Sequence, residues 1–201
     1  ENVKFVAQLK DIDAIIATGS NNSSLYFERY FGHLPHIIRK NRTSVAVLRG
    51  DESSAELKGL GADIFQYFGL GCRNVSKLLV TKEFEMDRFF EAIFPYQDII
   101  NHHKYANNYD YYKAIYLMNQ VPILENGFLL TIENKDLFAP ISVVYTQQFT
   151  DEKAIEHYIS QEQENIQVIV GNGYIPFGEA QKPTLMDYAD GIDTMQFLNQ
   201  L

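Results

Sequence analysis

A single cysteine is the residue of this chain best suited to covalent chemistry. Cys72 ends the segment Phe68-Gly69-Leu70-Gly71-Cys72, where a run with helical spacing stops and a strand-like run begins. Gly69 lies where a helix needs a left-handed terminating residue, and Gly71 lets the main chain approach a ligand closely. A thiol on such a turn reaches a bound carbonyl carbon while its own N–H points at the oxyanion. The pattern indicates a nucleophile, whereas the ordinary role of a free cysteine is buried packing.

Composition restricts the class of protein. The chain has 201 residues, 46% of them hydrophobic, which is enough for one good core. Its net charge of −9 has no basic stripe, so we expect neither a nucleic-acid partner nor an anionic lipid surface. No apolar run approaches the ~20 residues of a membrane helix, so no membrane span is predicted. A lone cysteine forms no internal disulfide and a reactive thiol lasts best in a reducing compartment, which predicts a cytoplasmic protein.

The elements around Cys72 are predicted from spacing and caps. A side-chain cap at Ser53 and apolar residues at three- and four-residue steps predict a helix over residues 53–68. Further strands are expected at 13–18, 36–39, 44–48, 75–80, 129–132, 141–145 and 166–170, and further helices from residue 25, at 85–94, within 98–119 and at 151–163. Alternating strands and helices predict an α/β domain with a mainly parallel sheet flanked by helices.

Four separated segments occur in a recognisable order. They are Thr18-Gly19-Ser20 after a strand-like run, Gly69-Leu70-Gly71-Cys72, Asp136-Leu137-Phe138-Ala139-Pro140 and Pro176-Phe177-Gly178. In this order they resemble the aldehyde dehydrogenase superfamily, and most closely its acyl-CoA reductase branch, which includes the fatty-acid reductases of bacterial bioluminescence. Two positions depart from the family pattern, because Asp136 replaces the usual glutamate and Ala139 replaces a glycine.

The resemblance implies a role for five residues on an aldehyde-dehydrogenase-like catalytic domain. Cys72 takes the acyl group as an enzyme-bound thioester, with its main-chain N–H in the oxyanion hole. Gly19 and Ser20 contact the diphosphate of NADPH or NADH, a role that also has a local reason, since free N–H groups at a helix start attract phosphate. Asp136 and Phe138 belong to the segment near the nicotinamide ribose. The alternatives are a plain helix cap at Ser20 and a solvated turn aspartate at Asp136.

A missing carboxylate predicts the direction of the reaction. Hydrolytic aldehyde dehydrogenases carry a glutamate, in a Glu-Leu-Gly-Gly strand, that activates water to release the acid. The matching stretch here, residues 36–40, has no carboxylate, and the next acidic residue is Asp51. Without a base for water, a thioester on Cys72 persists long enough to be reduced by NAD(P)H, and the expected product is an aldehyde.

The resemblance also implies how the chain is organised. Residues 1–24 correspond to the end of the cofactor-binding domain, 25–174 to the catalytic domain, and 175–201 to a C-terminal tail that serves as an oligomerisation segment. The implied partners are an acyl-CoA or acyl-carrier thioester substrate, a missing N-terminal cofactor domain and a second copy in a homodimer. The chain alone is therefore expected to be acylated at Cys72 but to turn over poorly or not at all.

Two other functions remain open. A cysteine hydrolase needs a histidine beside Cys72 in space, which the sequence does not exclude. A non-catalytic oligomerisation module would instead pair by sheet extension. A metal site is not predicted, because the adjacent His102 and His103 point apart on a helix and no cysteine or carboxylate stands at ligand spacing.

Overall fold

The computed structural model describes residues 3–82 and 84–201, which form two compact units. The larger unit is Arg42–Pro183, and the smaller one joins the chain up to Asn41 with Thr184–Leu201. The domain boundaries after residues 24 and 174 come from the family resemblance and differ from the limits of these compact units. They stay a prediction. Within the described residues, no helix combines the length and the apolar character needed to cross a membrane.

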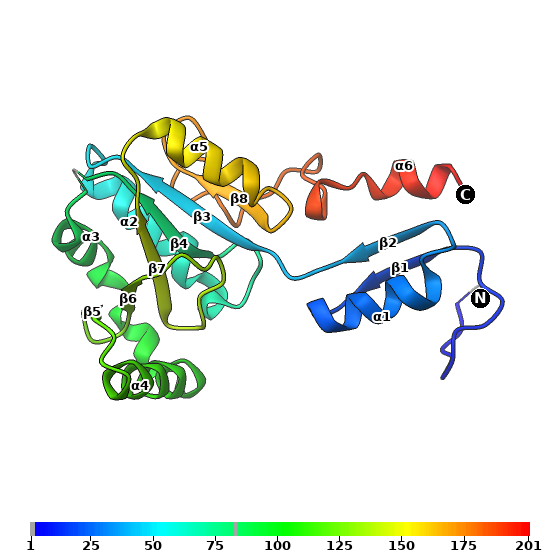
Figure 1. Cartoon of the computed structure of the whole chain (residues 1–201), viewed down its shortest axis with the longest axis horizontal. Coiled ribbons are helices and arrows are strands. Elements are labelled where there is room, and N and C mark those ends of the chain that lie inside the picture. The colour runs from blue at the N-terminus through cyan, green and yellow to red at the C-terminus, as the bar shows by residue number, and fades with distance from the viewer. Residues whose placement is uncertain (1–2, 83) are drawn as a thin grey trace. The chain divides into compact units, whose positions relative to one another are not determined.

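The larger unit is built on a six-stranded sheet in the order β5-β6-β7-β4-β3-β8. Its strands are β3 (Thr43–Leu48), β4 (Val75–Val80), β5 (Leu124–Glu125), β6 (Leu130–Glu133), β7 (Val143–Gln148) and β8 (Ile166–Val170). Only the short β5 is antiparallel to its neighbour, and every other pair is parallel. The predicted α/β fold with a mainly parallel sheet is thus confirmed (Figure 1).

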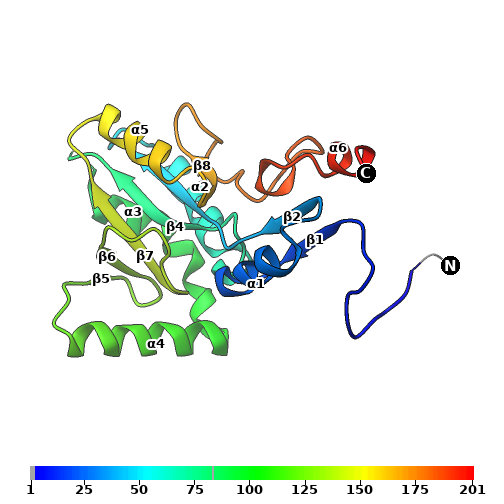
Figure 2. The same cartoon turned by 45° about the vertical axis from the view of Figure 1, so that its right-hand side comes forward.

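Helices cover both faces of this sheet. They are α2 (Ser54–Phe65), α3 (Met86–Ile93), α4 (His103–Met118) and α5 (Glu152–Gln161), with 3₁₀ turns η1 (Gln66–Gly69) and η2 (Phe94–Asn101). Helices α2 and α3 share one core with the sheet, and α5 packs on the alternate side chains of β3 and β4 in a second core. Helix α4 runs along the β5–β6 side (Figure 2). Since both faces are covered, all six residues of β3 are buried.

Helix α2 leads directly to the cysteine turn. Its start is fixed by a capping box, in which the Ser53 side chain accepts from the Glu56 N–H and the Glu56 side chain accepts from the Ser53 N–H. Leu57 and Leu60 are fully buried on its inner face, each contributing about 2 kcal/mol of transfer free energy.

The predicted end of this helix was wrong. It ends at Phe65 rather than continuing to Phe68, because Tyr67 and Phe68 have left-handed backbones with φ of 55° and 59°. Gly69 follows with φ of 73°, in the left-handed conformation expected for it.

The smaller unit contains its own two-stranded sheet. Strands β1 (Ile15–Thr18) and β2 (His36–Arg39) pair in parallel and are connected by α1 (Asn21–Phe31), and the unit also holds η3 (Ala189–Gly191) and α6 (Thr194–Asn199). The strand and helix predicted for this stretch are present, but α1 begins at Asn21 rather than at residue 25, because Ser20 caps it and residues 21–24, predicted as a turn, form its first turn. The two neighbouring strands predicted on either side of residues 40–43 belong to different sheets, which the sequence does not reveal.

Candidate functional site

Cys72 lies exposed on the turn that joins η1 to β4. Its carbonyl oxygen accepts a hydrogen bond of 2.9 Å from the Ser44 hydroxyl of β3, so the turn is attached to the sheet while the thiol stays in solvent. Within the described part of the chain, the Cys72 N–H donates to no other group. An accessible thiol beside an unused main-chain donor is the pairing that acyl transfer requires.

One buried amide side chain holds this turn in place. Asn74 donates from Nδ2 to the carbonyls of Asp63, Ile64 and Gln66 at 2.8–3.2 Å, which satisfies the end of helix α2. Its Oδ1 accepts from the Gly71 N–H at 2.8 Å. A Cβ at residue 71 would lie 3.0 Å from that oxygen. The group that approaches the main chain of Gly71 closely is therefore the Asn74 side chain.

The segment before Cys72 carries backbone strain. Tyr67 and Phe68 are successive bulky residues with positive φ, a conformation that costs roughly 1–2 kcal/mol for each L-residue. The Phe68 ring stacks on the His102 ring with centroids 4.0 Å apart, which holds the segment against the start of α4. Strain of this kind concentrates at functional sites.

The Pro176-Phe177-Gly178 segment is fixed against α2 by a buried carboxylate. Asp63 accepts from the Gly178 N–H at 2.7 Å and the Ala180 N–H at 3.0 Å. Its burial raises the pKa of this carboxyl group, an effect that the two N–H donors oppose. Arg73 of the cysteine turn donates from Nε to the Ala180 carbonyl. Ala180 therefore contacts both the cysteine turn and Asp63 of α2.

A buried lysine holds the segment that contains Asp136. Lys77 of β4 is fully buried, and its Nζ donates to the main-chain carbonyls of Asn134, Lys135 and Asp136 at 2.8–3.2 Å. Burial lowers the pKa of this ammonium group to about 8, while the charge of Asp136 acts in the opposite direction. The loop is thereby clamped by its backbone, leaving the Asp136 side chain exposed and the Phe138 ring 42% exposed.

The cysteine turn and the Asp136 segment meet the same two strands. Ser44 bonds the Cys72 carbonyl, while the preceding residue Thr43 lies 2.6 Å, oxygen to oxygen, from Ser76 of β4. The Ser76 hydroxyl donates in turn to the Leu137 carbonyl at 3.4 Å. Both segments are therefore attached at the amino-terminal ends of β3 and β4.

The other two predicted residues lie in the smaller unit. Ser20 caps α1, where its hydroxyl oxygen accepts from the Ser23 N–H at 3.2 Å. A Cβ at Gly19 would come 2.8 Å from the Ser23 Cβ, so glycine here allows the helix to start tightly against the strand. The exposed helix start has the chemistry to hold a diphosphate, although the Ser20 hydroxyl is already used as a cap.

The stretch matched to the hydrolytic glutamate forms β2 in the same unit. Arg39 in this strand donates to the Thr194 hydroxyl at 3.2 Å and lies 4.0 Å from an Asp190 carboxylate oxygen. Its polar side chain is thus engaged with the C-terminal segment.

The adjacent residues His102 and His103 occupy different positions at the start of α4. His102 precedes α4 and stacks on Phe68, whereas His103 is the first residue of that helix. Across residues 3–82 and 84–201, no group of three or more metal-ligating side chains is gathered.

Three supporting residues were missed at the level of sequence. Asn74 contacts main-chain groups 3 to 11 residues before it, whereas Asp63 and Lys77 contact main-chain groups more than 50 residues away, and no motif marks the three residues. Polar side chains at otherwise apolar positions, Asp63 within a helix and Lys77 within a strand, were the available signal.

The fold is similar to that of part of several solved aldehyde dehydrogenases. A γ-glutamyl-γ-aminobutyraldehyde dehydrogenase from Burkholderia cenocepacia superposes with a TM-score of 0.59 at 16% identity, over 80% of this chain and 40% of that one. Aldehyde dehydrogenase 21 from Physcomitrella patens gives 0.57 at 13% identity, over 81% and 40%. An indole-3-acetaldehyde dehydrogenase from P. syringae, solved with NAD⁺, gives 0.56 at 14% identity, over 80% and 40%.

These likenesses establish the architecture and its extent. The chain spans about 40% of the length of the solved structures that it matches. No family model matches the sequence, and no curated protein matches it significantly.

Proposed function

We propose that this chain is the acyl-accepting part of an NAD(P)H-dependent acyl-CoA reductase, with Cys72 as the nucleophile. The observation that carries the proposal is the exposed thiol on a turn fixed by Asn74, with the Cys72 N–H unused beside it. The aldehyde-dehydrogenase fold supports an oxidoreductase acting at the aldehyde level.

The acyl transfer balances without a further reactant. The Cys72 sulfur attacks the carbonyl carbon of an acyl-CoA, and a new C–S bond forms as the bond to the CoA sulfur breaks. The proton lost by the Cys72 thiol ends on the released CoA thiol. The Cys72 N–H supports the oxyanion of the tetrahedral intermediate, where a single donor of this kind is worth roughly 3 kcal/mol.

The fate of the thioester depends on whether a base is available to activate water. The stretch matched to the hydrolytic glutamate, β2, contains no carboxylate, so no base of that kind activates water. NADPH or NADH, when bound, supplies the hydride that takes the thioester to the aldehyde. Gly19 and Ser20 at the start of α1, with Asp136 and Phe138 on the clamped loop, are the residues of this chain proposed to contact it.

The remaining parts of the proposal concern the whole protein. A cofactor domain preceding this chain, a homodimer and a cytoplasmic location complete it, the last because an exposed thiol persists in a reducing compartment.

The fate of the acyl group tests this function. After stoichiometric incubation with octanoyl-CoA, we expect the protein to gain one octanoyl group that is lost only slowly in water. The Cys72→Ser variant is the matched control and should gain none. Rapid release of octanoate from the wild type would instead identify a thiol hydrolase.

A further inference from the structure

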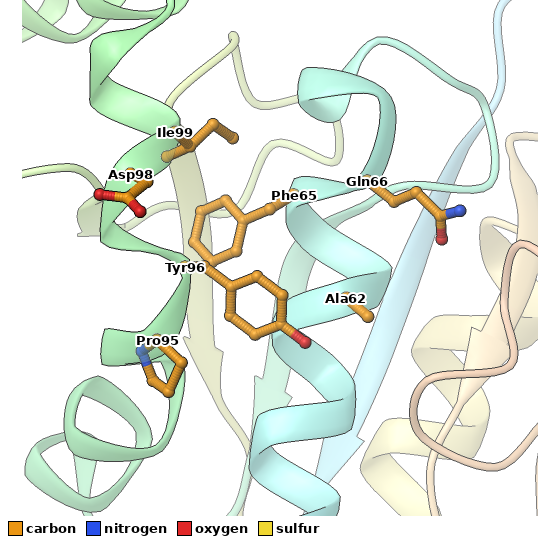
Figure 3. A pocket seen from close by; sticks show the side chains of 7 residues that line it. All are labelled: Ala62, Phe65, Gln66, Pro95, Tyr96, Asp98 and Ile99. Carbon is orange, nitrogen blue, oxygen red and sulfur yellow. The ribbon is translucent and has the colours of Figure 1, made fainter.

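A pocket of about 420 Å³ lies between the end of helix α2 and η2 (Figure 3). Its walls are mostly hydrocarbon, and Asp98 carries the charge among its lining residues. The Phe65 and Tyr96 rings pack with centroids 5.5 Å apart, and Figure 3 shows them side by side. These contacts hold η2 on α2, and none of them points to a particular ligand. The clearest unassigned chemistry lies instead in a turn that follows β8.

Two asparagines of the chain are followed directly by a glycine, Asn126 by Gly127 and Asn172 by Gly173. Both pairs lie in turns next to a strand. An Asn-Gly pair can deamidate spontaneously, because glycine has no Cβ to keep its nitrogen away from the side-chain amide of the asparagine. In a folded chain the rate depends on how firmly the amide and the following N–H are held. The two pairs differ in this respect.

Asn126 is held by hydrogen bonds. Its Oδ1 accepts from the Leu129 N–H at 3.0 Å and from the Phe128 N–H at 3.3 Å. Its Nδ2 is buried. The side-chain amide must break both bonds before its carbon can meet the Gly127 nitrogen, so we expect this pair to be protected.

Asn172 is exposed, and its side-chain amide is not held. Across residues 3–82 and 84–201, this amide makes no hydrogen bond and the Gly173 N–H donates to no other group. A Cβ at residue 173 would meet no atom within 4 Å, so the space beside the attacking nitrogen is open. Neighbouring groups therefore do not block the reaction at this pair.

The turn that contains Asn172 is joined to several parts of the larger unit. The Asn172 carbonyl accepts from Arg49 Nη1 at 2.9 Å, and Nη2 of the same guanidinium group donates to Glu152 of α5. The Gly171 N–H donates to the Ile175 carbonyl at 2.9 Å, just before the segment that helix α2 fixes. A change in this turn therefore reaches both contacts.

We propose that Asn172 is a site of spontaneous deamidation, which adds a negative charge to this turn and loosens its contacts with the segment that follows. The Gly173 nitrogen attacks Cγ of Asn172, and the bond from Cγ to the side-chain nitrogen breaks. Ammonia leaves with the proton that the Gly173 nitrogen loses. Water then opens the cyclic imide at either carbonyl and gives aspartate or isoaspartate, the second of which lengthens the main chain. This site is independent of the role proposed for Cys72.

Peptide mapping of the 201-residue chain during incubation at mildly alkaline pH tests the proposal. In the folded chain, Asn172 should convert roughly tenfold or more faster than Asn126, because Asn126 must first break two hydrogen bonds. In urea, where neither turn is folded, the two rates should be similar. No conversion at Asn172 in the folded chain, or equal rates at the two asparagines, would overturn the assignment.

Amide hydrogen exchange measures the consequence for the turn. After incubation, exchange at Gly171 and Tyr174, whose N–H groups both donate within this region, should be roughly fivefold faster than in the fresh protein. Asn172→Gln is the matched control, because its longer side chain keeps the amide but forms the corresponding ring far more slowly. Incubated Asn172→Gln should exchange like the fresh wild type. Unchanged exchange in a wild type that has converted, or equal acceleration in incubated Asn172→Gln, would overturn the proposed loosening.

Discussion

The two turns that carry predicted site residues are held to different extents. The turn at Cys72 is tied to two other elements: the Asn74 side chain accepts from the Gly71 N–H and donates to three carbonyls at the end of α2, and Ser44 of β3 donates to the Cys72 carbonyl. The turn at Gly19 and Ser20 is held by an exposed cap on the first turn of α1 and by one hydrogen bond of 3.4 Å, from the Gly19 N–H to the Arg39 carbonyl of β2. Covalent chemistry needs the first arrangement, because a nucleophile must stay in place as charge develops beside it. Contact with a diphosphate can be made from the second.

The largest effect is expected from removing the buried amide of the cysteine turn. Asn74→Ala leaves three carbonyls and the Gly71 N–H without this partner, and should lower the free energy of unfolding of the larger unit by about 3 kcal/mol. Urea unfolding measures the change. Asn107→Ala, on an exposed face of α4, is the control and should cost under about 0.5 kcal/mol. Equal effects of the two changes would mean that the turn is not held as described.

Asp63 should give a smaller effect that depends on pH. Asp63→Asn replaces one of two acceptor oxygens with a donor and should cost about 2 kcal/mol near neutral pH. Burial raises the pKa of Asp63, so the folded chain takes up a proton at a pH where the unfolded chain, with its aspartates near 4, does not. The Asp63 contribution to stability therefore grows as the pH falls through the raised pKa and levels off below about pH 4.

The direction of this pH dependence is measured by unfolding the wild type and Asp63→Asn at several pH values between about 7 and 4. The difference in their unfolding free energies should widen toward acid. A difference that narrows would show that the two N–H donors outweigh burial.

At the turn of Gly19 and Ser20, Ser20→Ala should lower the free energy of unfolding by about 1 kcal/mol, because one N–H at the start of α1 loses its side-chain acceptor. Amide hydrogen exchange at Ser23 and Ser24 would report it as an increase of roughly fivefold. Ser20→Gly is the matched control and should change exchange only slightly. No increase in Ser20→Ala would mean that the hydroxyl does not cap the helix.

The smallest expected effect is an increase in the free energy of unfolding. Tyr67 is 61% exposed and has a positive φ, so Tyr67→Gly should relieve strain at little loss of packing and raise the unfolding free energy by about 0.5 kcal/mol. Thermal unfolding measures it, with Tyr111→Gly on the exposed face of α4 as the contrasting change, expected to destabilise. A loss in both would show that Tyr67 packs usefully.

Local patterns were enough to predict most elements but not the support of the site. The cap at Ser53 and the strand at 166–170 follow from short-range spacing, and the structure contains both. The early end of α2 does not follow, because Asn74, eight or more residues later, collects the carbonyls that another helical turn would have used. From sequence, Lys77 is expected to face outward from its strand. In the structure it is buried, because the loop over it supplies three carbonyl acceptors. These contacts depend on tertiary structure, which a one-dimensional pattern does not contain.

Peptide mapping by mass spectrometry after incubation with octanoyl-CoA tests the central claim most directly. The account predicts one octanoyl group on the peptide that contains Cys72, formed at a rate that drops sharply in Asn74→Ala. Modification confined to lysines, or an unmodified Cys72 peptide under conditions where a small alkylating reagent labels the same thiol, would contradict it.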